Sequence, residues 1–280
     1  MIAPITEQES ARLREYIERE CGIRLDRGKE YLLESRLSHL VVEYGYSSFS
    51  ELHSDATKSR NVQLRDRIID AMTTHETFWF RDESAWRFLD EIVVPSLLDK
   101  IRGGERVRVW SAASSTGQEA YGFVILVLEA AAQNGIRINP DQFHVLGTDI
   151  SQAVLFQAIS GTYDVFSVGR GLPHDLQLKH FLVHGRMWEI SNEIKAFVSF
   201  RKFNLQDSFY GIGGPFDLVM MRNVAIYFRD EFKVGLFEKT ARILKTDGFL
   251  LLGSTESLRG YSQFYEIKEY KTCTYNVLKF

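Results

Sequence analysis

The feature that most constrains the fold is the stretch Arg106–Tyr121, in which a short apolar strand runs into a turn of small residues and then a helix. Val107, Val109 and Trp110 suit a strand that is buried on both faces, as in a parallel sheet covered by helices. The turn Ser111–Gly117 carries little side-chain bulk, so its backbone can approach a ligand closely. This pattern is typical of a nucleotide-type binding site at the end of a sheet strand.

A second apolar strand, Phe143–Asp149, follows at a spacing typical of a βαβ unit. It ends in an acid, and an acid at this position can accept hydrogen bonds from the two hydroxyls of a ribose. Alternatively, Asp149 only caps the helix that begins at Ile150 and Ser151. The residues alone leave both interpretations open.

The second half of the chain alternates strands with helices, which favours an α/β fold built on a largely parallel sheet. The expected strands are 107–111, 143–149, 198–204, 216–221 and 249–253, with helices at 117–133, 151–160 and 230–244. Two further strands, 265–270 and 274–278, are joined too tightly for a helical crossover, so the sheet should end in an antiparallel pair. The turn has one glycine, Gly117, and no G-x-G-x-x-G pattern, which favours a ligand with adenosine but no pyrophosphate.

The first part of the chain shows only helical signals and predicts a helical domain over residues 1–75. Thr6 and Glu9 form a possible capping box for a first helix that ends at Gly22. Apolar residues at helical spacing predict a second helix around 31–41, a third that opens at Ser47 and Ser48, and a fourth around 68–72.

A linker and a connecting helix are expected over residues 76–100, ahead of a larger domain over 101–280. The helix should run through Trp86 and Val93 toward Pro95.

The segment Thr73–Asp82 is unusual for a linker, because it has three aromatic residues in a row, at 78–80, where flexible linkers have small polar ones. These side chains are expected to pack between the two halves of the molecule. Arg81, beside the aromatic residues, needs an anion, which is either a protein carboxylate or the carboxylate of a ligand.

One region departs from the alternation and is expected to form a lobe inserted at about residues 162–197. The apolar residues from Leu176 to Leu182, Phe181 among them, predict a helix, and 185–190 predict a strand entered from a turn. Such a lobe can shape substrate access or cover an edge of the sheet, and both interpretations stay open.

Charge and composition argue against several classes of protein. A net charge of −3 disfavours nucleic acid as the main partner. The longest apolar run, 123–132, is too short for a bilayer and contains Glu129, and Met1–Pro4 lacks the basic start of a signal peptide. We therefore expect a cytoplasmic protein without membrane insertion. Cys21 and Cys273 lie far apart and outside any Cys/His cluster, so neither a disulfide nor a bound metal is expected.

Five blocks of the chain, taken in order, resemble one family closely, the chemotaxis receptor methyltransferases of the CheR type. The blocks are 73–81 (TTHETFWFR), 110–121 (WSAASSTGQEAY), 148–151 (TDIS), 216–228 (FDLVMMRNVAIYF) and 250–256 (LLLGSTE). The resemblance implies an α/β, class I S-adenosylmethionine-dependent methyltransferase fold. In that fold a Rossmann-like mixed sheet with an antiparallel last strand is joined to an N-terminal all-α domain and a small inserted β-subdomain.

Members of this family transfer a methyl group from S-adenosylmethionine to receptor glutamates and release S-adenosylhomocysteine. The resemblance therefore implies a protein-glutamate O-methyltransferase that acts, as a monomer, on the cytoplasmic methylation helices of chemoreceptors. Two other functions stay open: a signalling adaptor that binds the cofactor without turnover, and a methyltransferase that acts on nucleic acid or a small molecule.

The resemblance also implies roles for residues around the methionine part of the cofactor. Arg81 would pair with the methionine carboxylate, and Glu119 would meet the amino group. His75 and Thr77 would line the same pocket. Tyr227 would lie close to the sulfur and, together with Arg81, would act in catalysis by positioning.

Further implied roles concern the adenosine and the reacting end. Asp149 would hold the ribose hydroxyls, and Asn204 and Leu205 would lie on the adenine side. Arg222 and Asn223 would make contacts near the reacting end.

The chain departs from the family pattern at a few positions. His75 stands where the family usually has Asn. Relatives often have arginines on the second helix, facing acidic receptor helices, but residues 37–44 of this chain include none. Receptor docking is therefore expected to use other residues, such as those of the inserted lobe around Arg170 and Arg186, or to involve an unusual partner.

Overall fold

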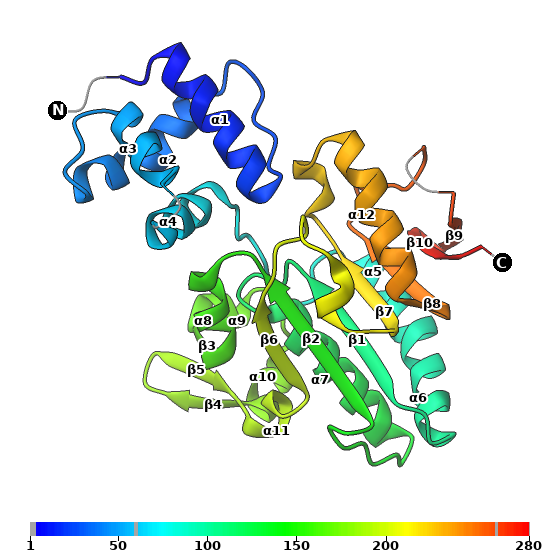
Figure 1. Ribbon diagram of the computed structural model, residues 1–280. Coiled ribbons are helices and arrows are strands. Elements are labelled where there is room, and N and C mark those ends of the chain that lie inside the picture. Colours follow the sequence, from blue (N-terminus) through cyan, green and yellow to red (C-terminus); the bar gives the residue numbers. More distant parts are fainter. Residues whose placement is uncertain (1–3, 59–60, 261–262, 280) are drawn as a thin grey trace.

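The computed structural model describes residues 4–58, 61–260 and 263–279 (Figure 1). Met1–Ala3, part of the stretch from which the lack of a basic start was argued, lie outside the described residues. Four helices form an N-terminal bundle beside a larger unit built on a seven-stranded sheet. Every helix among the described residues is too short or too polar to cross a membrane.

The N-terminal bundle consists of α1 (Glu7–Cys21), α2 (Glu30–Glu43), α3 (Phe49–Ala56) and α4 (Val62–Met72). The four predicted helices are confirmed. The capping box is also confirmed, because the Thr6 side chain accepts a hydrogen bond from the Glu9 N–H while the Glu9 carboxylate accepts one from the Thr6 N–H. The Ser48 hydroxyl caps α3 by accepting a hydrogen bond from the N–H of Glu51.

A continuous helical run leads from the bundle to the sheet. It comprises α5 (Glu83–Phe88), a π-helical turn (Leu89–Val93) and α6 (Val94–Arg102). The predicted helix therefore extends beyond Pro95. Proline cannot donate a backbone hydrogen bond, and it is tolerated here because it lies in the first turn of α6, directly after the π-helical turn.

The main sheet has the strand order β6-β2-β1-β7-β8-β10-β9. Its strands are β1 (Val107–Ala112), β2 (Phe143–Asp149), β6 (Val198–Lys202), β7 (Phe216–Met221), β8 (Leu244–Leu252), β9 (Tyr265–Tyr270) and β10 (Cys273–Leu278). The first five strands in this order pair in parallel, whereas β10 is antiparallel to both β8 and β9. The predicted mixed sheet with an antiparallel ending is confirmed, although β8 starts earlier and β6 ends earlier than expected.

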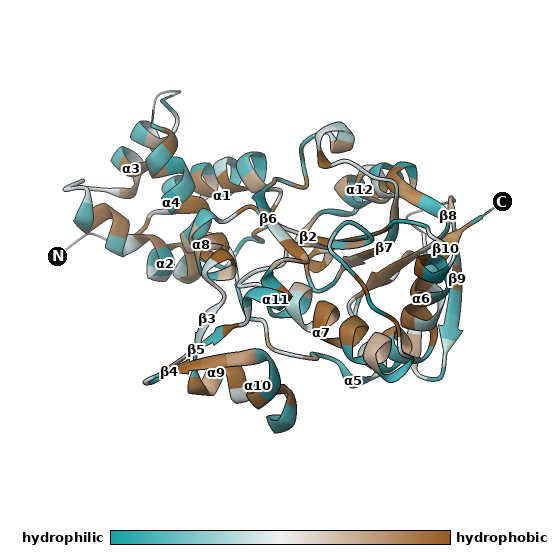
Figure 2. Cartoon of the chain, turned by 90° about the horizontal axis from the view of Figure 1, so that it is seen from below, coloured by the Kyte–Doolittle hydropathy of each residue, from teal (hydrophilic) through white to brown (hydrophobic). Residues whose placement is uncertain are grey.

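Helices cover both faces of this sheet. They are α7 (Gln118–Gln133), α8 (Gln152–Ser160), α11 (Asn192–Lys195) and α12 (Asp230–Ile243), with 3-10 turns at Phe209–Ile212 and Ala225–Tyr227. Val107 and Val109 pack in a core with α6 and α7, whereas Trp110 packs in a second core with α12. The first strand is therefore buried on both faces, as its sequence predicts, and Figure 2 shows how apolar helix α7 is.

The inserted lobe contains β3 (Thr162–Asp164), α9 (Val165–Gly169), α10 (His174–His180), β4 (Phe181–His184) and β5 (Met187–Ile190). Its three strands form a small sheet in the order β3-β5-β4. The prediction that Phe181 and Leu182 continue the helix is wrong, because both belong to β4. Phe181 pairs with Ile190, and its ring packs against Trp79, so these tertiary contacts override the local helical pattern.

Candidate active site

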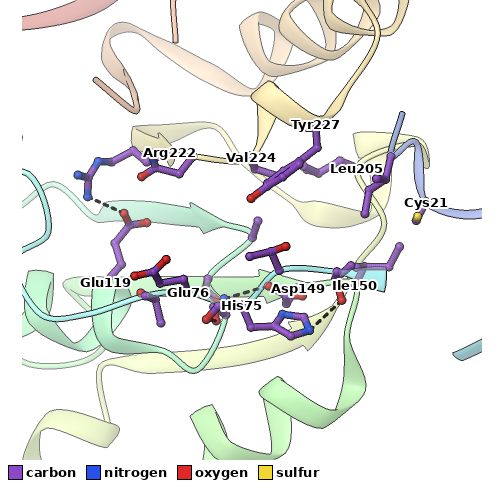
Figure 3. A pocket seen from close by; sticks show the side chains of 18 of the residues that line it. Cys21, His75, Glu76, Glu119, Asp149, Ile150, Leu205, Arg222, Val224 and Tyr227 are labelled. Carbon is purple, nitrogen blue, oxygen red and sulfur yellow. Dashed lines mark hydrogen bonds and ion pairs between the residues drawn. The ribbon is translucent and has the colours of Figure 1, made fainter. Parts of the chain in front are cut away.

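A pocket lies beyond the carboxyl ends of β1, β2, β6 and β7, where they approach the N-terminal bundle (Figure 3). Its lining includes every site residue predicted from the sequence: His75, Thr77, Arg81, Glu119, Asp149, Asn204, Leu205, Arg222, Asn223 and Tyr227. Parallel strands present their carboxyl ends at one edge of a sheet, which is why segments far apart in the sequence meet there.

The small-residue bend after β1 forms one wall of the pocket. Ala113 and Ser115 have left-handed backbone angles, φ 57° and 50°, which are uncommon for residues with a side chain. Two backbone hydrogen bonds hold the bend, from Ser114 N to Thr148 O (2.8 Å) and from Gly117 N to Ser114 O (3.0 Å). The bend therefore presents a fixed backbone and little side-chain bulk to a ligand.

Asp149 joins the end of β2 to this bend. Its Oδ2 accepts a hydrogen bond from Ser115 N (2.9 Å), and its Oδ1 accepts one from Ser151 N (3.0 Å). Ser151, not Asp149, caps α8, because its hydroxyl accepts from the N–H of Val154. Burial raises the pKa of Asp149, although the two backbone donors act in the opposite direction. Each carboxylate oxygen can accept a further hydrogen bond, so Asp149 can still bind two ligand hydroxyls.

Glu119, in the first turn of α7, is held by two partners. Its Oε1 accepts from the Ser111 hydroxyl (2.7 Å), and its Oε2 accepts from Arg222 Nη1 (2.9 Å), as Figure 3 shows. Arg222 also pairs with Asp82 at 2.9 Å, and its side chain is only 2% exposed. The guanidinium of Arg222 is thus shared between two carboxylates, and it orients Glu119 within the pocket.

Arg81 has spare hydrogen-bonding capacity. Its Nη1 donates to the backbone carbonyl of Glu76 (2.9 Å), and its guanidinium carbon lies 5.7 Å from the centre of the Phe78 ring. The Glu76 carboxylate itself pairs with Arg170 at 2.7 Å. Among the described residues, no carboxylate oxygen lies within 4.0 Å of the Arg81 guanidinium. Of the two anions expected from the sequence, the structure therefore favours that of a ligand.

His75 connects the linker to the bend. Its Nε2 lies 2.8 Å from the hydroxyl oxygen of Thr73, and its backbone carbonyl accepts a hydrogen bond from the Ser115 hydroxyl (2.9 Å). Thr77 follows on the same wall of the pocket. The linker is thus hydrogen-bonded to the ligand-binding bend at His75, whereas Trp79 farther along packs against Tyr163 and Phe181 of the inserted lobe.

The N-terminal bundle contributes a wall that the sequence did not predict. Cys21 and Ile23, at the end of α1, line the pocket together with Asn204 and Leu205. Asn204 Nδ2 donates to the carbonyl oxygen of Glu20 (2.8 Å), which ties the segment after β6 to α1. No motif in the sequence signals this long-range contact.

The segment after β7 forms the opposite side of the pocket. Asn223 has a left-handed backbone angle of φ 58°, and the 3-10 turn that follows ends at Tyr227. The backbone carbonyl of Tyr227 accepts a hydrogen bond from Arg24 N (2.8 Å) in the N-terminal part of the chain. In Figure 3 the hydroxyl end of Tyr227 points into the cavity.

These groups fit a ligand that has a ribose, an amine and a carboxylate. Asp149 can accept from ribose hydroxyls, Glu119 is an anion for an ammonium group, and Arg81 is a cation for a carboxylate. S-adenosylmethionine carries all three groups and no phosphate, in agreement with a bend that lacks the G-x-G-x-x-G pattern of pyrophosphate-binding loops. Elsewhere in the described chain, no group of three or more His, Cys, Asp or Glu residues is arranged to hold a metal ion.

Comparison with known proteins agrees with this geometry. The family model described as "CheR methyltransferase, SAM binding domain" matches residues 75–273, and "CheR methyltransferase, all-alpha domain" matches residues 8–73.

Three relatives, all named chemotaxis protein methyltransferases, match nearly the whole chain. Those of Vibrio parahaemolyticus and Vibrio anguillarum are each 38% identical over 265 residues, which cover 94% of this chain and 94% of the relative. That of Pseudomonas aeruginosa is 37% identical over 255 residues, covering 91% of this chain and 92% of the relative. The fold is thus that of a class I methyltransferase with S-adenosylmethionine as its cofactor. The chain belongs to the CheR methyltransferase family.

Proposed function

We propose that the protein is a protein-glutamate O-methyltransferase. It transfers a methyl group from S-adenosylmethionine to glutamates on the cytoplasmic methylation helices of chemoreceptors, and so adapts the chemotactic signal. The observation that carries this proposal is the likeness to chemotaxis protein methyltransferases over 94% of the chain. The protein would act in the cytoplasm as a monomer, with neither nucleic acid nor the membrane interior as a partner.

The polar groups of the pocket suggest how the cofactor is held. Asp149 would accept hydrogen bonds from the ribose hydroxyls, since each of its oxygens accepts one backbone N–H and can accept more. Arg81 would pair with the methionine carboxylate. Glu119, kept in place by Arg222, would face the amino group.

The remaining lining would complete the cofactor site. Asn204 and Leu205 would lie on the adenine side, next to Cys21 of the bundle. His75 and Thr77 would form the wall that also carries Arg81.

The reaction asks the protein for alignment more than for proton transfer. S-adenosylmethionine supplies an electrophilic methyl group bound to a sulfonium sulfur. When the methyl group is transferred, the rest of the cofactor leaves as a neutral thioether. A substrate glutamate, with a reference pKa of about 4.3, is already an anionic nucleophile at neutral pH and needs no general base. Tyr227 and Asn223 would position the reacting groups. The walls of the pocket would exclude water, so that the substrate carboxylate and the sulfonium of the cofactor attract each other strongly.

Receptor docking would use a surface other than the second helix. Arg36 is the arginine of α2, and its guanidinium is turned inward, where Nη1 donates to the carbonyl oxygen of Met72 (2.6 Å). Arg170 of the inserted lobe instead pairs with Glu76, which lines the pocket. A receptor helix that lies along the lobe near Arg170 would bring its glutamate to the mouth of the pocket.

A transfer assay tests the proposed function. The protein is incubated with methyl-labelled S-adenosylmethionine and cytoplasmic fragments of candidate receptors, and the label is then challenged with base. The proposal predicts base-labile label on receptor glutamates, because a glutamate methyl ester hydrolyses in base. Label on RNA or on a small molecule, or cofactor binding without any transfer, would contradict it.

Variants make the assay specific to the pocket. Asp149→Asn should abolish most of the transfer, because the amide places an NH₂ group against hydroxyl donors. Glu269→Gln changes a carboxylate on the exposed surface of β9 and should transfer label like the unmodified protein.

A further inference from the structure

Glu256, four residues beyond β8, has an unusual set of hydrogen bonds for a side chain outside the pocket lining. Its Oε2 accepts from the backbone N–H groups of Asn223 and Gly253, both at 2.7 Å. Its Oε1 accepts from the N–H groups of Val224 and Ile226, both at 3.1 Å. One carboxylate thus binds four backbone donors, and three of them belong to the segment after β7.

These three donors lie in the segment that presents Asn223 and Tyr227 to the pocket. Asn223 has φ 58°, a backbone conformation that costs free energy for a residue with a side chain. The 3-10 turn that follows includes Ile226, whose N–H is one of the donors to Glu256. The Glu256 carboxylate therefore offsets the backbone strain at Asn223 and fixes the 3-10 turn that follows.

Gly253 shows how closely this cluster is packed. A methyl group added at Gly253 would lie 2.7 Å from Glu256 Oε2, 2.8 Å from Asn223 Nδ2 and 2.9 Å from Asn223 N. Real side-chain carbons do not approach so closely, so only glycine allows the strand end, the carboxylate and the turn to meet.

We infer that Glu256 is a positioning residue of the methyltransferase site, whose carboxylate fixes the turn that presents Asn223 and Tyr227 to the cofactor. The inference rests on the proposed roles of those two residues. Bonds from backbone N–H groups to a carboxylate are charge-assisted and roughly twice as strong as neutral ones, so four of them can hold one turn against its strain. Tyr227 is held at the other end by Arg24 N, so the segment is fixed on both sides.

Hydrogen exchange in the cofactor-free protein tests the structural half of the inference. In Glu256→Gln the amide side chain has one oxygen in place of two, and its NH₂ group faces backbone donors. The amides of Asn223, Val224 and Ile226 should then exchange at least about tenfold faster, whereas the amides of β10 should not change. Unchanged exchange at the three amides would overturn the inference.

Binding of S-adenosylhomocysteine tests the functional half. Glu256→Gln should weaken binding about tenfold, as should Asn223→Ala, because each loses the same contact of Asn223 with the cofactor. If Glu256 acts through the turn, the double variant should bind about as weakly as either single variant. A double variant weakened by the product of the two single effects would overturn the inference, as would Glu256→Gln with normal affinity.

Two controls separate this role from general destabilisation. Glu269→Gln removes an exposed carboxylate of β9 and should change neither exchange nor binding. Glu256→Asp keeps the carboxylate, so its amide exchange and its affinity for S-adenosylhomocysteine should lie between those of Glu256→Gln and those of the unmodified protein. If Glu256→Gln does not fold, Glu256→Asp replaces it in both measurements. Neither measurement uses a receptor, so failure of the proposed substrate and failure of this inference give different results.

Discussion

Arg222 Nη1 donates a hydrogen bond of 2.9 Å to Glu119 Oε2, across 103 positions of the chain. The Arg222 side chain is buried and also pairs with Asp82, so one cation serves two carboxylates. The family resemblance implies contacts of Arg222 near the reacting end, and this role stays a prediction for a residue that lines the pocket. In the structure the guanidinium of Arg222 orients Glu119 and, through Asp82, links the start of the connecting helix to the sheet.

Arg222→Met should lower the free energy of unfolding by about 3 kcal/mol, because Asp82 and Glu119 lose the buried cation between them. Unfolding in urea, followed by circular dichroism, measures the loss. Arg102→Met is the matched control, since Arg102 is half exposed and pairs with Asp99 one helical turn away. We expect a change below about 1 kcal/mol there, and an equal effect of the two substitutions would contradict the buried pairing.

Arg81→Ala should weaken the binding of S-adenosylhomocysteine about tenfold or more, because a charge-assisted pair with the ligand carboxylate is lost. Stability should change little, since among the described residues Arg81 pairs with no carboxylate. Titration calorimetry measures the affinity. Arg87→Ala, which removes an exposed arginine paired with Glu83, should bind like the unmodified protein. Normal affinity in Arg81→Ala would refute the role.

The affinity for S-adenosylhomocysteine should fall as the pH is lowered. Only the ionised carboxylate of Asp149 can accept from both ribose hydroxyls, and burial raises its pKa, so the fall should begin above the pH at which an ordinary aspartate titrates. Below the pKa of the free protein, each pH unit should cost up to about tenfold in affinity, because a proton must leave before the ligand binds.

Calorimetry across a pH series checks this dependence. Asp149→Asn should bind more weakly at neutral pH and should lose most of the dependence. An affinity of the unmodified protein that stays constant down to the onset of acid unfolding would contradict the assignment of Asp149.

Both cysteines should be slow to react with thiol reagents in the folded protein. Burial raises the pKa of Cys21 to about 12, and burial also raises the pKa of Cys273. At pH 8 the thiolate fraction of Cys21 is then about 10⁻⁴, roughly a thousandfold less than for a free cysteine. Ellman's reagent should report two fast thiols only after denaturation. A fast reaction of either cysteine in the native state would contradict the burial of its thiol.

Local patterns predicted those parts of the fold that depend on neighbours in the sequence. The capping box at Thr6, the strand Phe143–Asp149 and the tight antiparallel ending are all present. Phe181 was placed in a helix because its apolar spacing fits one, but pairing with Ile190 and contact with Trp79 decide its conformation. Such contacts join distant segments and leave no periodic signal.

The same distinction holds in the pocket. Asp149 and the small-residue bend could be identified because strand and turn follow each other in the sequence. Cys21 and Glu256 could not, since the first reaches the pocket through the packing of the bundle and the second acts only through backbone N–H groups. Glu256 lies in a block that resembles the family, which was the one available hint of its importance.

The central claim is that the small-residue bend after β1 and the carboxylate of Asp149 hold the adenosyl part of the cofactor, with Arg81 at its methionine end. A crystal structure of the protein with S-adenosylhomocysteine tests it most directly. We predict both ribose hydroxyls within hydrogen-bond distance of Asp149 and the ligand carboxylate paired with Arg81. A pocket without ligand at saturating concentration, or a ligand bound elsewhere, would contradict the claim.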